Sequence, residues 1–195
     1  MGERLGVFGG TFDPVHVGHL VAAVNAGHAL RLDRVLLVVA NEPWQKGDRT
    51  LTPAEDRLAM VSAAVAGCRG LAASRLEIDR GGDSVTADTL EALLVEDPTR
   101  ELFLIVGSDV ASTLDTWRRA EATAQLATLV VVNRPGAPEP APSWPGRVVK
   151  VAIPNFDLSS SDLRARAAEG RPLDYLVPDA AIDVIGRRGL YSGDR

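Results

Sequence analysis

The stretch Gly9–His19 reads GGTFDPVHVGH and joins two segments with different hydrophobic patterns. Leu5–Phe8, which precedes it, is a short apolar run that predicts a buried strand, and the residues from Leu20 onward predict a helix. The stretch is therefore expected to form a strand–loop–helix corner. Glycines let a backbone approach a ligand closely, and the first turn of a helix presents free N–H groups and the positive end of its dipole. Such a corner is suited to binding a phosphate group.

Two histidines at the helix entrance sharpen this expectation. His16 and His19 are spaced i, i+3, so their side chains lie on one face of the helix. Because a positive charge is disfavoured at a helix N-terminus, we expect both imidazoles to be neutral in the empty site and to gain protons as polyphosphate arrives. A zinc site stays open as an alternative, although Asp13 is the only further ligand nearby, and so do two structural histidines. A dinucleotide fingerprint does not fit, because Gly9 and Gly10 are adjacent.

Further apolar runs predict the other strands. Val35–Ala40 and Leu102–Val106 are continuous apolar segments, which is typical of parallel strands covered on both faces. Other runs that predict strands are Leu71–Ile78, Leu129–Val132 and Val148–Ile153. Because predicted helices alternate with these runs, we expect an α/β fold with a doubly wound, mostly parallel sheet.

Composition limits the classes of protein that this chain can belong to. With 195 residues, 46% of them hydrophobic and 24% charged, it is expected to form a single domain over residues 1–195. A formal net charge of −5 argues against nucleic-acid binding, and the single cysteine excludes an internal disulfide. No apolar run is long enough to span a bilayer and the N-terminus does not resemble a signal peptide, so a cytoplasmic location is expected.

Two helix starts can be identified from capping patterns. Thr52–Glu55 has the spacing of a capping box with Pro at the first helical position, and Ser159–Asp162 has a Ser-x-x-Asp box. Arg164 lies in or next to the first turn after the second box, where its charge opposes the helix dipole. A bound anion would reverse that penalty. Asp109 follows the glycine at the end of another strand, where a carboxylate can meet a nucleotide's base and ribose.

The string GGTFDPVHVGHL resembles the T/HxGH signature of the nucleotidyltransferase superfamily, and in particular the opening of the nicotinate-mononucleotide adenylyltransferases. Three later strings support the same family. The segment 84–90, SVTADTL, is similar to S-Y-T-x-D-T-L, the segment 158–164, LSSSDLR, to I-S-S-T-x-I-R, and the segment 133–136, NRPG, contains R-P-G. The strings occur in the family's order and cover nearly the whole chain. Positions that depart from the family pattern are Trp44, Gln45, Val85 and Arg118.

The resemblance implies a Rossmann-like fold and an enzyme that transfers an adenylyl group from ATP to nicotinate mononucleotide, with Mg²⁺ carried by the ATP phosphates and no protein side chain as a metal ligand. It implies catalytic roles for His16, His19, Lys46 and Arg164. It implies that ATP is bound by Gly9, Gly10, Thr11, Phe12, Gly18, Gly107, Asp109, Arg134, Ser160 and Ser161. It implies that the mononucleotide is bound by Asp13, Asn41, Ser84, Thr86, Trp117 and Arg118, with the Trp117 indole stacked on the pyridinium ring. No nucleic acid or membrane is expected as a partner, and a homo-oligomer stays open.

Two other functions compete with this interpretation. Pantetheine-phosphate adenylyltransferases share the first and last motifs, but they lack the SVTADTL segment and the Pro-rich insertion at 137–146. A non-catalytic nucleotide-binding module would keep the glycines and Asp109, but it would not need His16, His19, Lys46 and Arg164 together. The complete set favours an enzyme.

Overall fold

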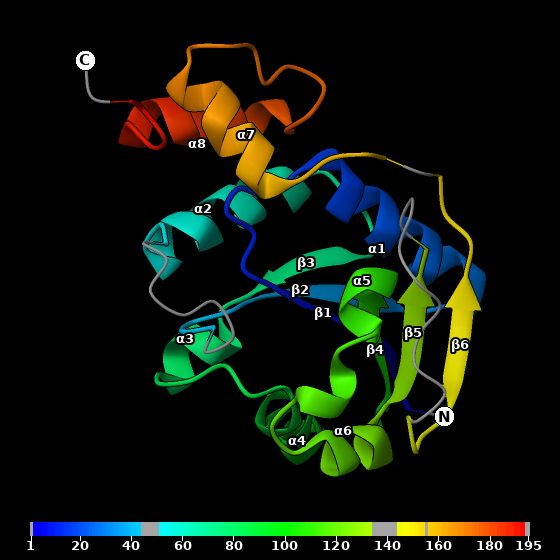
Figure 1. The fold of residues 1–195 in the computed structure, drawn as a ribbon. Coiled ribbons are helices and arrows are strands. Elements are labelled where there is room, and N and C mark those ends of the chain that lie inside the picture. The colour runs from blue at the N-terminus through cyan, green and yellow to red at the C-terminus, as the bar shows by residue number, and fades with distance from the viewer. Residues whose placement is uncertain (1, 44–50, 134–143, 155, 194–195) are drawn as a thin grey trace.

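The computed structural model describes residues 2–43, 51–133, 144–154 and 156–193 (Figure 1). Its centre is a sheet whose strands all pair in parallel. The strands are β1 (Arg4–Gly10), β2 (Arg34–Val39), β3 (Leu71–Ser74), β4 (Glu101–Gly107), β5 (Thr128–Val132) and β6 (Val148–Val151). The predicted α/β class with a parallel sheet is confirmed.

The strand order is β3-β2-β1-β4-β5-β6, so the chain reverses direction across the sheet between β1 and β4. In open α/β sheets, ligands bind beyond the carboxyl ends of the strands at such a switch point. The stretch Gly9–His19 follows β1 and therefore starts at this position. The sheet is thus doubly wound, as the apolar runs predicted.

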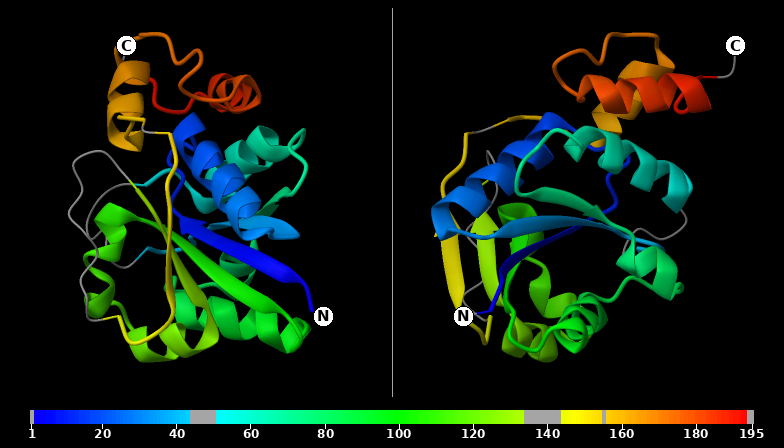
Figure 2. Two further views of the ribbon diagram at one scale, coloured as in Figure 1. Left: turned by 90° about the vertical axis from the view of Figure 1, so that its right-hand side faces the viewer. Right: turned by 180° about the vertical axis from the view of Figure 1, so that it is seen from behind.

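Helices cover both faces of the sheet (Figures 1 and 2). One face packs against α1 (Val17–Leu30) and α2 (Ala54–Val65), and the other against α4 (Thr86–Glu96), α5 (Ser108–Ala111) and the segment around α6 (Ala120–Leu126). Helix α8 (Asp179–Arg188) joins the first of these two cores from beyond α2. Because both faces are covered, the strand interiors are apolar throughout. Phe8 and Ile105, for example, belong to the first core, which lies between the sheet and helices α1 and α2. Val7 and Leu104 belong to the second core, which lies between the sheet and helices α4 and α5.

The last two helices, α7 (Ser160–Ala168) and α8, lie beyond α1 and α2 (Figure 2). Helix α8 packs against α2. The Leu176 carbonyl between them accepts a hydrogen bond of 3.0 Å from the Val17 backbone N–H at the start of α1. The end of the chain is therefore attached to the loop that follows β1. No helix in the described ranges is both long enough and apolar enough to span a membrane.

Two local predictions were wrong. The strand predicted over Leu71–Ile78 ends at Ser74, and a short helix, α3 (Leu76–Arg80), follows, helped by an Arg75–Asp79 ion pair of 2.7 Å across one helical turn. Thr52 does not cap α2, whose N-cap is Pro53 without a side-chain hydrogen bond. The backbone of Thr52 is used instead, as its N–H donates to Asp13 at 3.4 Å.

Candidate active site

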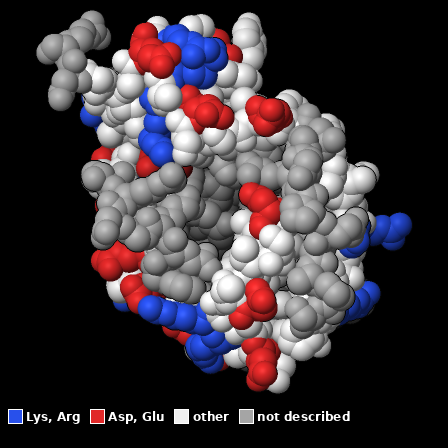
Figure 3. Space-filling view, in the orientation of Figure 1, with Lys and Arg blue, Asp and Glu red and all other residues white. Residues whose placement is uncertain are grey.

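A cavity of about 690 Å³ opens at the carboxyl ends of the central strands. Its size falls within the range typical of small-molecule sites. In the orientation of Figure 1, the space-filling view shows this face of the molecule hollowed near its middle, with acidic side chains beside the hollow (Figure 3). Anionic substrates would thus need cationic or N–H donors from inside the cavity.

The three glycines of the first motif differ in what a side chain at each position would contact. A side chain at Gly9 would meet no described atom within 4 Å, so the backbone there is open to the cavity that it lines. A Cβ at Gly10 would lie 2.8 Å from the Phe12 ring, and one at Gly18 would lie 3.1 Å from the imidazole of His16. Two of the predicted ATP-binding glycines therefore also make room for neighbouring rings.

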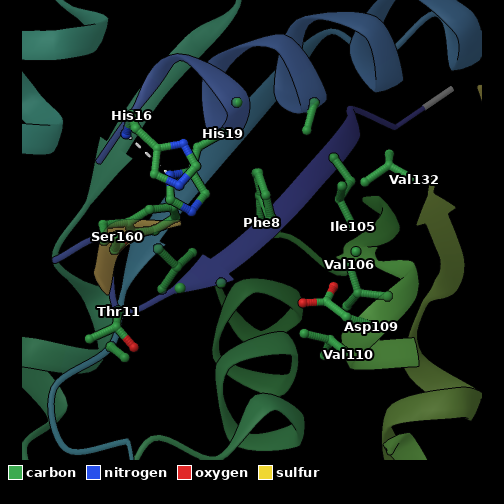
Figure 4. A pocket seen from close by; sticks show the side chains of 18 of the residues that line it. Phe8, Thr11, His16, His19, Ile105, Val106, Asp109, Val110, Val132 and Ser160 are labelled. Carbon is green, nitrogen blue, oxygen red and sulfur yellow. Dashed lines mark hydrogen bonds between the residues drawn. The ribbon is translucent and has the colours of Figure 1, made fainter. Parts of the chain in front are cut away.

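The two imidazoles lie stacked at the start of α1 (Figure 4). The ring centroids of His16 and His19 are 3.7 Å apart, with an interplanar angle of 28°. The His16 backbone N–H donates to Nδ1 of His19 at 3.2 Å, so a neutral His19 carries its proton on Nε2. Nε2 of His19 is therefore a donor. The prediction that both rings lie on one face of the helix is confirmed.

The second helix start, at α7, lines the same cavity. Ser159 is its N-cap and accepts a hydrogen bond of 3.1 Å from the backbone N–H of Asp162, as the Ser-x-x-Asp box predicted. The Ser160 hydroxyl donates to the Pro14 carbonyl at 3.0 Å, which joins α7 directly to the first motif. Ser160 and Ser161 are the first two residues of α7, so their backbone N–H groups have no acceptor within the helix. Two amides and a helix dipole are thus available to an anion.

Arg164 is held next to these amides. Its Nη1 donates to the backbone carbonyl of Asp13 at 2.6 Å and lies 4.0 Å from the Asp13 carboxylate, and its Nη2 donates to the Ser161 hydroxyl at 3.2 Å. The protein therefore supplies a partner that offsets the unfavourable helix dipole even before an anion binds. The structure brings His16, His19 and Arg164 to one cavity.

Asp13 itself is 3% exposed, and its carboxylate is used inside the protein. The Tyr191 hydroxyl donates to Oδ1 of Asp13 at 2.6 Å. Within the described ranges no group of three or more His, Cys, Asp or Glu side chains is arranged to hold a metal ion. The zinc interpretation of the histidine pair therefore lacks a third ligand in this part of the protein.

The remaining predicted nucleotide contacts are distributed around the cavity. Gly107 and Asp109 line it at the end of β4, and Figure 4 shows Asp109 across the cavity from the two imidazoles. Thr11 and Phe12 line it next to the first motif. Lys46 and Arg134 lie outside the described residues, as do Trp44 and Gln45.

The predicted mononucleotide-binding residues fall into two groups. Asp13, Ser84, Thr86 and Trp117 line the cavity, and the indole N–H of Trp117 has no hydrogen-bond partner among the described residues. Asn41 and Arg118 are not among the described lining residues. Asn41 donates to Ser84 through its backbone N–H, at 2.9 Å, and Arg118 forms an ion pair with Asp83. These two residues support the cavity wall.

Two buried charged residues were missed by the sequence analysis. Glu77 lines the cavity and accepts a hydrogen bond of 2.6 Å from the Thr89 hydroxyl. Arg57 is 1% exposed and occupies the buried stripe of α2 together with Met60, Val61 and Ala64. A charged residue at the spacing of a buried helical face is a signal that could have identified Arg57. Glu77 was hidden because its segment was predicted to be a strand.

Comparison with known proteins gives a consistent result. The cytidylyltransferase-like family model matches residues 7–166. A probable nicotinate-nucleotide adenylyltransferase from Corynebacterium kroppenstedtii is 46% identical over 191 residues, which cover 96% of this chain and 90% of that protein. One with the same description from Streptomyces coelicolor is 43% identical, over 95% of this chain and 100% of its own length.

Solved structures agree at the level of the fold. The nicotinic acid mononucleotide adenylyltransferase of Plasmodium falciparum, complexed with NaAD, superposes with a TM-score of 0.81 over 97% of both chains, at 18% sequence identity. The family model and the sequence relatives point to one group of nucleotide-transferring enzymes, and the solved structure has the same fold. The chain therefore belongs to the cytidylyltransferase-like nucleotidyltransferases and, within them, to the nicotinate-nucleotide adenylyltransferase family.

Proposed function

We propose that this protein transfers the adenylyl group of ATP to nicotinate mononucleotide, forming nicotinate adenine dinucleotide and pyrophosphate. The observation that carries the proposal is the convergence of two helix N-termini on one cavity. The start of α1 brings His16 and His19, and the start of α7 brings Arg164 with the amides of Ser160 and Ser161. Both helix ends favour negative charge, and the hydrogen bond from Ser160 to Pro14 holds the start of α7 against the loop that leads to α1.

In the proposed reaction, a 5′-phosphate oxygen of the mononucleotide attacks the α-phosphorus of ATP. A new P–O bond forms as the bond between the α-phosphorus and the α–β bridging oxygen breaks, and that oxygen leaves with pyrophosphate. The attacking phosphate is already anionic, so no strong general base is needed. The work of the protein is to position the two anions and to stabilise the charge that develops.

We assign each cationic or N–H donor to a part of the triphosphate. Nε2 of His19 donates to an α-phosphate oxygen, and His16 donates at the α–β bridge. Arg164 and the two amides at the start of α7 hold the β- and γ-phosphates. These groups act as N–H donors and do not bind a metal ion, so a magnesium ion at this site would be held by the ATP phosphates. When bound, Mg²⁺ neutralises charge on the departing pyrophosphate.

The other end of the cavity is proposed to hold the mononucleotide. Trp117 lines this part of the cavity with an indole that can stack on a pyridinium ring, a contact worth about 0.5–2 kcal/mol. Ser84 and Thr86 lie in the same wall and supply hydroxyl donors. A carboxylate accepts from such donors but brings none of its own, which distinguishes nicotinate from nicotinamide.

One assay tests the proposal. The purified protein is incubated with ATP and Mg²⁺ together with nicotinate mononucleotide, nicotinamide mononucleotide or phosphopantetheine in parallel, and pyrophosphate and the dinucleotide are measured. We expect turnover with nicotinate mononucleotide to exceed that with the other two acceptors, and to stop when the divalent metal is removed by a chelator. Preference for phosphopantetheine, or binding of ATP without release of pyrophosphate with any acceptor, would overturn the proposal.

A further inference from the structure

Arg57 is buried on α2, at the back of the site and outside the set of described residues that line the cavity. Burying a guanidinium is costly unless its donors are satisfied and its charge is compensated. Burial lowers the pKa of Arg57, and the nearby Asp13 carboxylate offsets part of that effect. A methionine or leucine could be buried at this position of the helix without that free-energy cost. The presence of an arginine therefore needs a structural explanation.

The explanation lies in the hydrogen bonds that the guanidinium makes with the described residues, whose acceptors are backbone carbonyls. Nε donates to Thr52 at 2.8 Å, and Nη1 donates to Thr11 at 2.9 Å and to Ala40 at 2.7 Å. Nη2 donates to Asn41 at 3.1 Å. The acceptors belong to three separate segments: the loop after β1, the end of β2 and the approach to α2.

These carbonyls lie where the sheet stops. The pairing of β1 with β2 continues as far as the Ala40 N–H, which donates to the Gly10 carbonyl at 2.9 Å. Beyond that point the two strands separate, and the planar fork of Arg57 bridges the carbonyls of Thr11 and Ala40. A lysine has three donors around one nitrogen and cannot reproduce this geometry.

The bridged segments form part of the cavity. Thr11 and Ala40 line it, and the backbone N–H of Asn41 donates to the hydroxyl of Ser84, which also lines it. The residue after Thr11, Phe12, has a left-handed backbone with φ of 52°, a conformation that surrounding contacts must hold for a non-glycine residue. Fixing the Thr11 carbonyl therefore also fixes the turn that leads to His16 and His19.

We propose that Arg57 is a positioning residue for adenylyl transfer: its guanidinium holds the loop after β1 and the end of β2 in register, so that the histidine pair and the mononucleotide wall face each other. This inference rests on the function proposed above. Displacement of catalytic groups by about 1 Å can cost on the order of 10²-fold in rate. Loss of Arg57 is therefore expected to lower turnover by displacing the residues that it positions, because Arg57 itself does not contact the substrates.

The test compares Arg57→Lys and Arg57→Met with Val61→Ala. Val61 is fully buried on the same helix, packs in the first core and lies outside the cavity lining, so its truncation destabilises α2 without touching the loops. Thermal unfolding is measured first, and all assays are run well below the lowest melting temperature. We expect both Arg57 variants to lose on the order of 10²-fold in kcat, and Val61→Ala to stay within about twofold of the original protein.

Hydrogen exchange gives a second measurement that does not depend on activity. In the folded Arg57→Lys protein, the amides of residues 11–16 and 40–43 are expected to exchange faster while the strands stay protected, whereas Val61→Ala should not show this local pattern. If Arg57→Lys keeps kcat within twofold and loop exchange is unchanged, the positioning role is wrong. If the original protein performs no adenylyl transfer, the proposed function fails, and the exchange comparison still decides whether Arg57 holds the loops.

Discussion

His19 uses its two ring nitrogens for different tasks. Nδ1 accepts the backbone N–H of His16 and so caps the start of α1, while Nε2 is left as the donor. The stacking of the two rings follows from their spacing, and the small volume of Gly18 permits it. Replacing His19 by alanine would remove the cap and the donor together, so its effect on catalysis would be mixed with an effect on folding.

A pair of substitutions separates the two tasks. In His19→Asn the amide oxygen can replace Nδ1 as the cap, but nothing replaces Nε2, and we expect kcat to fall by about 10²–10³-fold with little change in melting temperature. In His19→Gln the amide N–H₂ can reach the position of Nε2, so a smaller loss of kcat is expected. Steady-state kinetics and thermal unfolding of both proteins provide the measurement. An Asn variant within tenfold of the original protein would remove His19 from the proposed chemistry.

The same residues show how far the sequence could predict the site. The spacing of His16 and His19 on a helix is local, so the orientation of the pair could be predicted without coordinates. The direction of the Asp13 carboxylate could not be predicted, because its donors are remote in sequence: Tyr191 lies 178 positions and Thr52 39 positions later in the chain. The sequence predicted that Arg164 lies near the start of a helix, where the dipole opposes its charge. It did not predict the contact of Arg164 with the Asp13 carbonyl, because the two residues are far apart in the sequence. Long-range partners of polar groups leave no periodic pattern.

At the scale of elements, continuous apolar runs identified the strands, and the error occurred in a run that polar residues interrupt. Leu71–Ile78 contains enough apolar residues for a strand, yet only Leu71–Ser74 pairs with β2. The remainder forms α3, which turns Glu77 toward α4 and the cavity. Pattern alone does not show where an edge strand loses its neighbour, since that depends on the length of the adjacent strand.

A buried hydrogen bond joins α3 to α4, from the Thr89 hydroxyl to the Glu77 carboxylate, and Nη1 of Arg80 donates to the same hydroxyl at 3.1 Å. Thr89→Val keeps the shape of the side chain and leaves the carboxylate without this donor, so we expect the free energy of unfolding to fall by ~1–3 kcal/mol. Thr89→Ser keeps the hydroxyl and is the matched control. Urea unfolding of the three proteins gives the measurement, and equal stability of the Val and Ser variants would show that the bond contributes nothing.

At the scale of the whole molecule, the end of the chain closes on its beginning. Tyr191 donates to Asp13 in the first motif, Leu176 accepts from the first residue of α1, and Ser160 donates to Pro14. The helices α7 and α8 are therefore part of the site's support. Burial, followed by the hydrogen bond to Asp13, raises the pKa of the Tyr191 hydroxyl above its ordinary value of 10.0.

This shift predicts a pH-dependent contribution to stability. Below pH ~10 the hydroxyl is protonated in both the folded and the unfolded protein, and the contribution of Tyr191 is fully present. Above that pH the unfolded state releases a proton that the folded state retains, so the contribution is lost as pH rises. We expect Tyr191→Phe to lower the free energy of unfolding by ~1–3 kcal/mol at neutral pH, and the difference from the original protein to shrink at higher pH.

Urea unfolding between pH 7 and pH 11 measures this difference, and Tyr175→Phe is the control because Tyr175 is 91% exposed. The control should leave stability unchanged near neutral pH, since an exposed hydroxyl exchanges one water contact for another. Because Asp13 also contacts Arg164, loss of the Tyr191 donor should raise the KM for ATP more than the KM for the mononucleotide. A stability difference that stays constant up to pH 11 would mean that the Tyr191 hydroxyl ionises equally in the folded and unfolded states, and would contradict the raised pKa.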